Sequence, residues 1–203
     1  PDAVSRYNAD GKVDKSMGNI IQGQRLASDS MSGNNEWDWD MLRRINYMLA
    51  NSSNCEDEAL RTKYDGIAYF FRAYFYFQKV MRFGDVPYYD KVLESTDTEF
   101  LNKARDDRGF VMDKVMEDFD KAIEMIPATK DAYSARVTKW VALAMKSRAA
   151  LFEGTWRKYH GMPDAEKYLQ QAAAAAKTFI DESGYVLYNQ GEEPSRDLFC
   201  SDK

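Results

Sequence analysis

The chain has 203 residues, of which 44% are hydrophobic and 14% aromatic, so it can bury a substantial core in one domain or two small ones. Its net charge of −5 argues against a nucleic-acid backbone or an anionic membrane surface as the main partner, because both attract clustered Lys and Arg. It contains no run of about 18 apolar residues, which excludes a membrane-spanning helix of ordinary composition.

Sequence motifs for cofactor, metal or nucleophile chemistry are missing. Cys55 and Cys200 are too few for a disulfide framework and do not form the close pairs of a zinc site, although they leave open one long-range disulfide. There is no Gly-rich phosphate loop and no serine nucleophile elbow. We therefore expect no metal and no cofactor, and the pattern favours binding over catalysis.

Residues 1–35 are rich in Gly, Asn, Ser and Asp and show little periodicity, so we interpret them as mainly loop. The amino terminus PDAVSRYNAD lacks the charged and apolar regions of a signal peptide. From Glu36 the spacing becomes helical as far as the Asn51-Ser52-Ser53-Asn54 cluster. The predicted buried stripe of this helix consists of Trp37, Met41, Ile45, Met48 and Leu49.

A second helix is predicted from about Glu56 to Phe83, and eight Phe or Tyr residues fall between Tyr64 and Phe77. A helix that is apolar around most of its circumference should be enclosed on several sides, which makes this helix the expected centre of the fold. Gly84 can adopt the left-handed conformation that ends a helix, and Pro87 restricts Val86 to an extended conformation.

The segment from Asp85 to Arg108 is long for a connection within a domain, and long ordered loops often carry function. Three further helices are predicted over 109–126, 135–159 and 163–182. Their apolar stripes are Val111, Val115, Phe119, Ala122, Ile123 and Ile126; then Val137, Trp140, Val141, Ala144, Arg148, Leu151 and Phe152; and finally Ala165, Tyr168, Leu169, Ala172, Ala176, Phe179 and Ile180. Five helices and no convincing strand predict an all-α protein.

Two of these helices carry the spacing of a tetratricopeptide repeat. Phe119, Ala122 and Pro127 match the second helix of such a unit, and Trp140, Leu143, Ala144 and Ser147 follow the first with two substitutions. Small residues such as Ala allow neighbouring helix axes to approach closely. Because inserted loops lengthen the units, we predict irregular tetratricopeptide-like helical hairpins with long inserted loops.

Four motifs in a fixed order resemble the SusD/RagB family. They are Phe71-Arg72-Ala73-x-Phe75-x-Phe77, Arg82-Phe83-Gly84-Asp85-Val86-Pro87, Val115-x2-Asp118-Phe119-x2-Ala122-x2-Met125-Ile126-Pro127, and Ala142-x-Ala144-x3-Arg148-x2-Leu151. The early segment WDWDMLRRINYMLAN is also similar to a helix of that family. The resemblance covers roughly residues 36–190.

The resemblance implies a surface-exposed lipoprotein of the Bacteroidetes outer membrane. Such a protein captures oligosaccharides, or in some members peptides, without catalysis and delivers them to a SusC-like, TonB-dependent transporter. The resemblance also implies a lipid-bearing Cys at the mature amino terminus and a carboxyl-terminal region, and we expect both to lie outside these 203 residues. We therefore expect a loop-rich segment at 1–35, a SusD-like helical domain at 36–190, and at 191–203 the start of a further region.

The family motifs themselves suggest structural rather than ligand-binding roles. Arg72 lies in the aromatic helix, where a buried guanidinium needs a carboxylate, so we predict that it pairs with Asp85 or Asp118; contact with a ligand or partner is the alternative. Asp85 is expected to satisfy backbone N–H groups at its turn. With Gly84 and Pro87, these residues form the predicted structural motif.

Trp39 is the first candidate for ligand binding. Trp37, Met41 and Ile45 belong to the predicted buried stripe, whereas Trp39 shares a predicted helix face with Arg43 and Asn46. The apolar face of a sugar ring can stack on an exposed indole while polar groups bind its hydroxyls. The polar candidates are Asn34, Asn35 and Asp38. The alternative is that Trp39 packs under the part of the family fold that this chain lacks.

Other candidates are weaker. Trp156, Tyr159 and His160 cluster in GTWRKYHG, where a single His beside aromatic rings is more typical of packing than of catalysis. The adjacent acids Asp57/Glu58, Asp106/Asp107 and Glu192/Glu193 do not face each other as glycoside hydrolysis requires. Two rival functions remain, a tetratricopeptide-type adaptor that binds a peptide in a helical groove and a carbohydrate-active enzyme.

Overall fold

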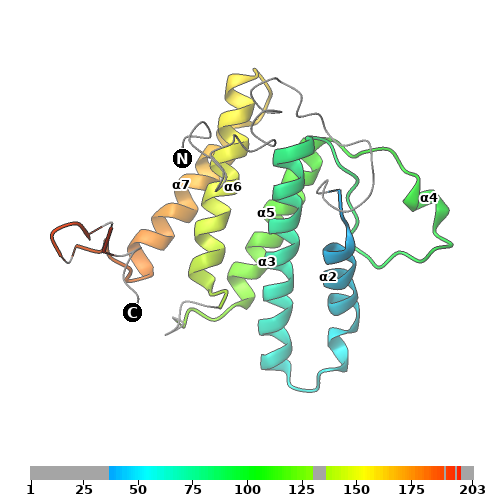
Figure 1. Ribbon diagram of the computed structural model, residues 1–203, viewed down its shortest axis with the longest axis horizontal. Helices are drawn as coiled ribbons and strands as arrows, with labels where there is room; N and C mark the ends of the chain where they lie inside the picture. The colour runs from blue at the N-terminus through cyan, green and yellow to red at the C-terminus, as the bar shows by residue number, and fades with distance from the viewer. Residues whose placement is uncertain (1–36, 130–135, 190, 195, 198–203) are drawn as a thin grey trace, which may run out of the picture. The chain divides into compact units, whose positions relative to one another are not determined.

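The computed structural model describes residues 37–129, 136–189, 191–194 and 196–197. The chain divides into two compact units, Pro1–Trp39 and Asp40–Lys203, and every helix in the described part belongs to the second unit. These helices are α2 (Asp40–Asn51), α3 (Glu58–Phe83), α4 (Thr98–Leu101), α5 (Arg108–Met125), α6 (Lys139–Tyr159) and α7 (Ala165–Glu182), with a 3-10 turn at Ser52–Asn54 (Figure 1). The fold is all-α, as predicted.

The long helices pack on their neighbours in sequence. The most extensive contacts join α3 to α5 and α6 to α7, while α5 also contacts α6 and α2 lies along α3. Each pair buries apolar side chains that neither helix can bury alone, which is the principle of a helical-hairpin repeat. None of the helices in the described ranges is long and apolar enough to cross a membrane.

Polar caps define several helix ends. The Asp57 carboxylate accepts the Leu60 N–H at the start of α3, Asp107 accepts the N–H groups of Gly109 and Phe110 at the start of α5, and Thr138 accepts that of Val141 at the start of α6. The predicted connection 85–108 contains the short helix α4 and one isolated antiparallel bridge between Val86 and Asp106.

The core is best predicted on α5. Its expected stripe is buried at Val111, Val115, Phe119, Ala122 and Ile126, and Ile123 is half-buried. The neighbouring core between α6 and α7 contains Trp140, Leu143 and Ala175, with Ile123 and Phe179 packed against it. The apolar periodicity of α5 is therefore confirmed.

The prediction for α6 is largely wrong. Trp140 is buried, but Val141, Ala144, Arg148 and Leu151 are exposed. The helix instead buries Ala142, Leu143, Ala149, Ala150, Glu153, Gly154 and Arg157. The buried face of α6 differs from the predicted one because it contains Glu153 and Arg157, which pair with each other. The positions of the apolar residues alone therefore do not identify this face.

Close helix approach on α6 depends on Gly154 rather than on Ala144. A Cβ at Gly154 would lie 2.8 Å from Cγ of Leu169 on α7, closer than side chains normally approach. On α3, Gly66 is equally tight, because its Cβ would lie 2.7 Å from Cβ of Met125. The small residues that bring the helices together are thus glycines at the two main interfaces.

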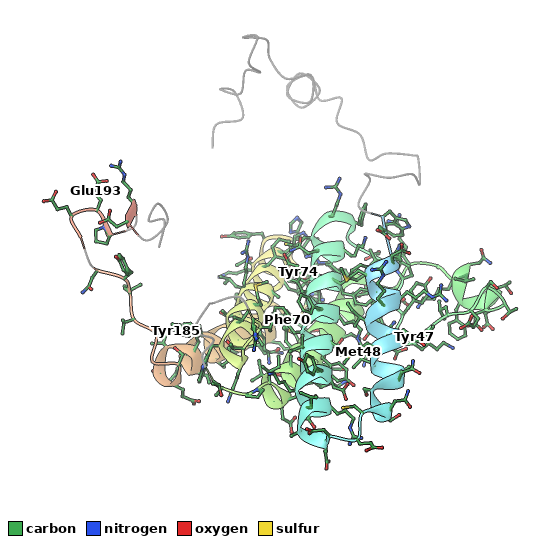
Figure 2. All side chains as sticks on the ribbon, turned by 60° about the horizontal axis from the view of Figure 1, so that its bottom comes forward. Tyr47, Met48, Phe70, Tyr74, Tyr185 and Glu193 are labelled. Atoms are coloured by element: carbon green, nitrogen blue, oxygen red, sulfur yellow. The ribbon has the colours of Figure 1, made fainter. Side chains whose placement is uncertain are left out.

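The aromatic helix α3 is enclosed on part of its circumference only. Phe70, Ala73, Tyr76, Phe77 and Val80 are buried as expected. A second face is exposed and carries Leu60, Tyr64, Phe71 and Tyr74. Figure 2 shows Tyr74 on α3, and Tyr47 on α2, which is 61% exposed. The prediction that α3 is enclosed on several sides is correct where α5 and α2 pack against it, and it is wrong for the exposed face.

Candidate functional site

Trp39 lies just before α2 rather than on its surface. Its ring makes an edge-to-face contact with Trp37, with ring centroids 5.2 Å apart and an interplanar angle of 80°. Both indoles are half-buried and Asp38 is exposed. Asn34 and Asn35 lie outside the described residues, so the proposed polar set around Trp39 stays a prediction.

The predicted surface of α2 needs correction, because the helix begins at Asp40 and not at Glu36. Met41, expected inside, is 58% exposed, whereas Leu42 and Asn46 are buried with Ile45. Asn46 was expected to share an exposed face with Trp39. It is buried because its amide takes part in a polar network with α3.

The turn after α3 follows the prediction in part. Gly84 ends the helix with a positive φ of 70°, but its ψ of −112° lies outside the left-handed helical region that was predicted. Its N–H donates to Val80 O at 3.0 Å. Asp85 accepts the backbone N–H of Arg108 at 2.9 Å, so its carboxylate satisfies a main-chain donor across the loop. Pro87 is buried next to the Val86 bridge residue. The turn therefore closes the base of the loop 85–107.

Arg72 pairs with Asp118 of α5, one of its two predicted partners. Its Nε and Nη2 donate to the two carboxylate oxygens at 2.7 and 2.8 Å, a bidentate arrangement, and both residues are buried. Burial alone would lower the pKa of Arg72, but the hydrogen bond and charge of Asp118 outweigh it and raise that pKa above the ordinary value. The guanidinium is thus a permanent buried cation.

A network that the sequence did not reveal extends from Arg72 to the loop. Arg72 Nη1 donates to Oδ1 of Asn46 at 3.3 Å and to the carbonyl of Asp90 at 3.4 Å. Asn46 Nδ2 donates to the carbonyls of Tyr89 and Lys91 at 3.0 and 3.1 Å. We call the set of side chains that hold this stretch, Asn46, Arg72 and Tyr76, the loop tether.

Tyr76 completes the tether from the buried side of α3. Its hydroxyl accepts the Tyr89 N–H at 2.6 Å and donates to the Tyr89 carbonyl at 3.1 Å. Burial raises the pKa of Tyr76 well above the ordinary value, so the phenol keeps its proton and can donate. Its ring also lies 4.7 Å from that of Tyr88, which begins the tethered stretch.

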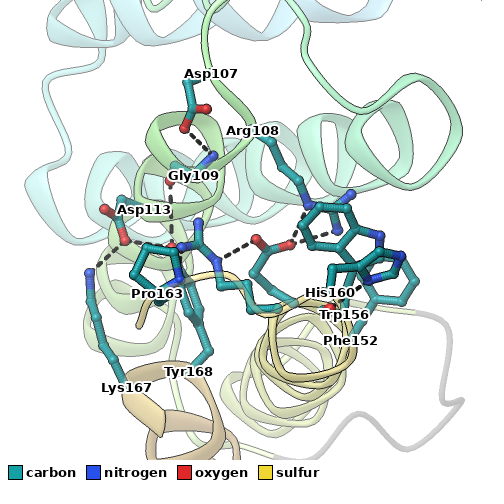
Figure 3. Close-up of polar contacts among 12 residues, drawn as sticks. Asp107, Arg108, Gly109, Asp113, Phe152, Trp156, His160, Pro163, Lys167 and Tyr168 are labelled. Carbon is teal, nitrogen blue, oxygen red and sulfur yellow. Dashed lines mark hydrogen bonds and ion pairs between the residues drawn. The ribbon is translucent and has the colours of Figure 1, made fainter. Parts of the chain in front are cut away.

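A second buried ionic cluster joins α5 to α6 (Figure 3). Glu153 is completely buried and accepts from two arginines: Arg108 Nε and Nη2 at 2.9 and 2.7 Å, and Arg157 Nε at 2.8 Å. Arg157 also donates to the Pro163 carbonyl in the turn before α7, at 2.9 Å. We call Arg108, Glu153 and Arg157 the helix clamp.

Asp113 extends the polar contacts from the clamp to α7. Tyr168 and Lys167 each donate to its Oδ1 at 2.7 Å (Figure 3). Burial acts to raise the pKa of Asp113, but these hydrogen bonds outweigh it and lower the pKa below its ordinary value. The Arg157 guanidinium also lies 4.9 Å from the Tyr168 ring centroid. These contacts hold three helices at fixed positions.

The Trp156 and His160 rings are stacked at 4.3 Å between centroids, and His160 Nδ1 lies 2.7 Å from the Trp156 carbonyl. The Arg108 guanidinium is 3.9 Å from the Trp156 ring centroid. His160 is therefore packed at the end of α6, as expected, while Tyr159 is 84% exposed.

The adjacent acids have structural contacts. Asp57 and Asp107 cap helices, and Asp106 accepts the Tyr88 N–H at 2.6 Å and pairs with Lys103 at 2.5 Å. Glu193 pairs with Arg196 at 3.2 Å. Within the described ranges no group of three or more His, Cys, Asp or Glu is placed to hold a metal ion, and Cys55 carries a free thiol. Cys200 lies outside those ranges.

The fold is that of an irregular tetratricopeptide-like helical scaffold. Residues 6–151 match the family model of SusD-like proteins, which is described as starch-binding and associating with the outer membrane. The chain therefore belongs to the SusD-like family. Among curated proteins, none matches it.

Solved structures of SusD-like proteins share the fold. One from Bacteroides fragilis has 26% identity and a TM-score of 0.63, over 82% of this chain and 30% of its own. A laminarin-binding SusD-like protein has 20% identity and a TM-score of 0.67, over 91% of this chain and 37% of its own. A structure with a xylogluco-oligosaccharide has 20% identity and a TM-score of 0.69, over 91% and 35%. This chain thus spans about a third of the length of these relatives.

Proposed function

We propose that this protein binds oligosaccharides without catalysis at the surface of a bacterial outer membrane and delivers them to a SusC-like, TonB-dependent transporter. The observation that carries the proposal is the family match over residues 6–151, whose description combines starch binding with the outer membrane. Two proteins of the same fold are described with laminarin and with a xylogluco-oligosaccharide, so glucose-based oligosaccharides are the first ligands to test.

The scaffold supports capture rather than turnover. Burial of the helix clamp and of the Arg72–Asp118 pair fixes the helices, so a bound sugar would meet groups that lose little freedom on binding. Of the acids considered for hydrolysis, Asp57 and Asp107 cap helices and Asp106 is held in an ion pair with Lys103. We assign the sugar platform to Trp39, with Asp38, Asn34 and Asn35 as its polar neighbours.

The test is a calorimetric titration of the protein with laminarin and xyloglucan oligosaccharides, followed by chromatography of the sugar after prolonged incubation. We expect saturable binding and recovery of intact oligosaccharide. Sustained release of shorter products by purified protein would contradict the non-catalytic proposal. Saturable binding of peptides, with no binding of any glycan, would favour the adaptor function instead.

Delivery is tested separately, by co-purification with a transporter encoded beside this protein. A stable complex in detergent would support the proposed partner. Labelling of intact cells with a membrane-impermeant reagent tests the surface location, and protection of the protein from the reagent would contradict it.

A further inference from the structure

Each member of the loop tether binds main-chain groups of residues 89–91. Its three members lie on α2 and α3, and each is buried. Together they donate to the carbonyls of three consecutive residues, 89, 90 and 91, and Tyr76 also accepts the N–H of Tyr89.

In a sheet, a neighbouring strand would bind the main-chain groups of residues 89–91. Here the side chains of the loop tether bind them instead. The Val86–Asp106 bridge is the one isolated bridge within the described ranges, and residues 88–91 have no ladder beyond it. Their carbonyls would otherwise need water. Arg72 uses Nε and Nη2 for Asp118, so Nη1 remains for Asn46 and for the Asp90 carbonyl. The amide of Asn46 is oriented by the same contact, because its oxygen accepts from Arg72.

Such a network costs desolvation that apolar residues would avoid. Replacing a buried ion pair by well-packed hydrophobic residues is often neutral or stabilising, so packing of α3 on α5 alone does not require the Arg72–Asp118 pair. What apolar residues could not supply is a fixed path for residues 88–91. The tether therefore determines the shape of the loop.

Residues 88 and 89, whose positions the tether fixes, in turn bind residues 100 and 103 in the outer part of the loop. The Tyr89 hydroxyl donates to the Phe100 carbonyl at 3.0 Å, and Lys103 Nζ donates to the Tyr88 carbonyl at 2.9 Å. The loop projects beyond the helices with α4 at its outer end (Figure 1). There Phe100 is 40% exposed, with Lys91 Nζ 3.6 Å from its ring centroid and Asn102 exposed nearby in sequence.

We propose that residues 88–106 form a second, preformed oligosaccharide-contacting surface of this protein, and that Asn46, Arg72 and Tyr76 are its positioning residues. The inference rests on the proposed function. Phe100 is 40% exposed and offers the part of its ring that the Lys91 ammonium does not cover to a sugar. The Lys91 ammonium and the second N–H of the Asn102 amide, whose first binds the Thr98 carbonyl, offer donors to the sugar hydroxyls. A rigid loop makes weak sugar contacts productive because little conformational entropy is lost on binding.

Tyr76→Phe tests the tether, because it removes one hydroxyl and keeps the ring. The matched control is Tyr168→Phe, since Tyr168 is an equally buried tyrosine whose hydroxyl bonds Asp113 and lies outside the loop. We expect amide hydrogen exchange over residues 88–106 to become about tenfold faster in Tyr76→Phe, as for the loss of an ordinary hydrogen bond, and to stay unchanged in the control.

Affinity for laminarin and xyloglucan oligosaccharides is measured on the same variants and on Phe100→Ala. Tyr76→Phe and Phe100→Ala should each weaken binding several-fold, and Phe100→Ala should do so without changing exchange in the rest of the loop. Unchanged exchange in Tyr76→Phe would overturn the positioning role, and unchanged affinity in both variants would overturn the contact surface. If the wild-type protein binds no glycan, the proposed function and the contact surface both fail, while exchange still decides the tether.

Discussion

The loop tether and the helix clamp use the same chemistry at two places for different purposes. In each, a buried carboxylate on one helix binds an arginine on another, and an arginine also reaches a main-chain carbonyl, of Asp90 in the first and of Pro163 in the second. Asp118 binds one arginine, Arg72, with Lys121 3.7 Å from its second oxygen, and the spare donor of Arg72 holds a long loop. In the clamp, Glu153 alone serves two arginines and joins helices. We infer that the clamp determines stability and the tether determines loop shape.

Removal of the Glu153 carboxylate should have the largest effect. Glu153→Ala leaves Arg108 and Arg157 without their shared anion, so we expect a loss of about 3–5 kcal/mol in the free energy of unfolding. Urea denaturation measures it. Glu117→Ala is the control, since Glu117 is exposed and pairs with Lys114 on the surface, a contact worth about 0–1 kcal/mol. Equal losses in the two variants would contradict the importance of the clamp.

Asp118→Asn should have the next largest effect. It removes the charge that Arg72 binds but keeps one oxygen as an acceptor, so we expect a loss of about 3 kcal/mol and faster exchange in the loop 88–106. Asp120→Asn provides the comparison. Asp120 lies two residues after Asp118 on α5, is exposed, and pairs with Lys146 of α6. A stable Asp118→Asn variant with normal exchange in the loop would show that the pair is not needed for either purpose.

The smallest expected effect is on the loss of folding stability at low pH, through Asp113. The pKa of Asp113 is below its ordinary value of 3.8 in the folded chain, because hydrogen bonds from Lys167 and Tyr168 outweigh burial. A lowered folded pKa contributes stability that is present above the unfolded value and is lost as pH falls through the folded one. We therefore expect the wild-type protein to lose more stability than Asp113→Asn as the pH is lowered from about 5 to about 3.

Urea midpoints at a series of pH values measure this difference. Parallel pH profiles for the two proteins would mean that the Asp113 contacts to α7 add nothing to the clamp, and the clamp alone would then join the helices.

The sequence predicts those parts of the fold in which apolar periodicity and burial agree. The stripe of α5 is confirmed at Val111, Val115 and Phe119, and the charged Asp118 is buried on the same helix only through its pair with Arg72. On α6, Glu153 and Arg157 are buried because they neutralise each other, whereas the predicted stripe included Arg148, which is exposed. A mutual pair of buried charges leaves no apolar periodicity that could mark the buried face. The Arg72–Asp118 pair was predictable, since a buried guanidinium needs a carboxylate.

The loop tether was not predictable from the sequence. Asn46 and Tyr76 bind main-chain carbonyls, which every residue has, so no residue type marks their partners; those of Asn46 lie 43 and 45 residues away. Helical periodicity predicts that Asn46, a polar residue next to the exposed Tyr47, lies on the surface, although it is buried. The only available signal was the length of the loop 85–108, which indicated a segment of functional interest without showing what holds it.

The ligand-binding claim is tested most directly by calorimetry on Trp39→Ala with the oligosaccharide that the wild-type protein binds best. The control is Tyr159→Ala, which removes a ring that is 84% exposed at the carboxyl-terminal end of α6. We predict that Trp39→Ala lowers the affinity at least about tenfold, as expected for loss of an aromatic stacking contact, and that Tyr159→Ala leaves it unchanged. An unchanged affinity in Trp39→Ala would remove Trp39 from the site and contradict the account.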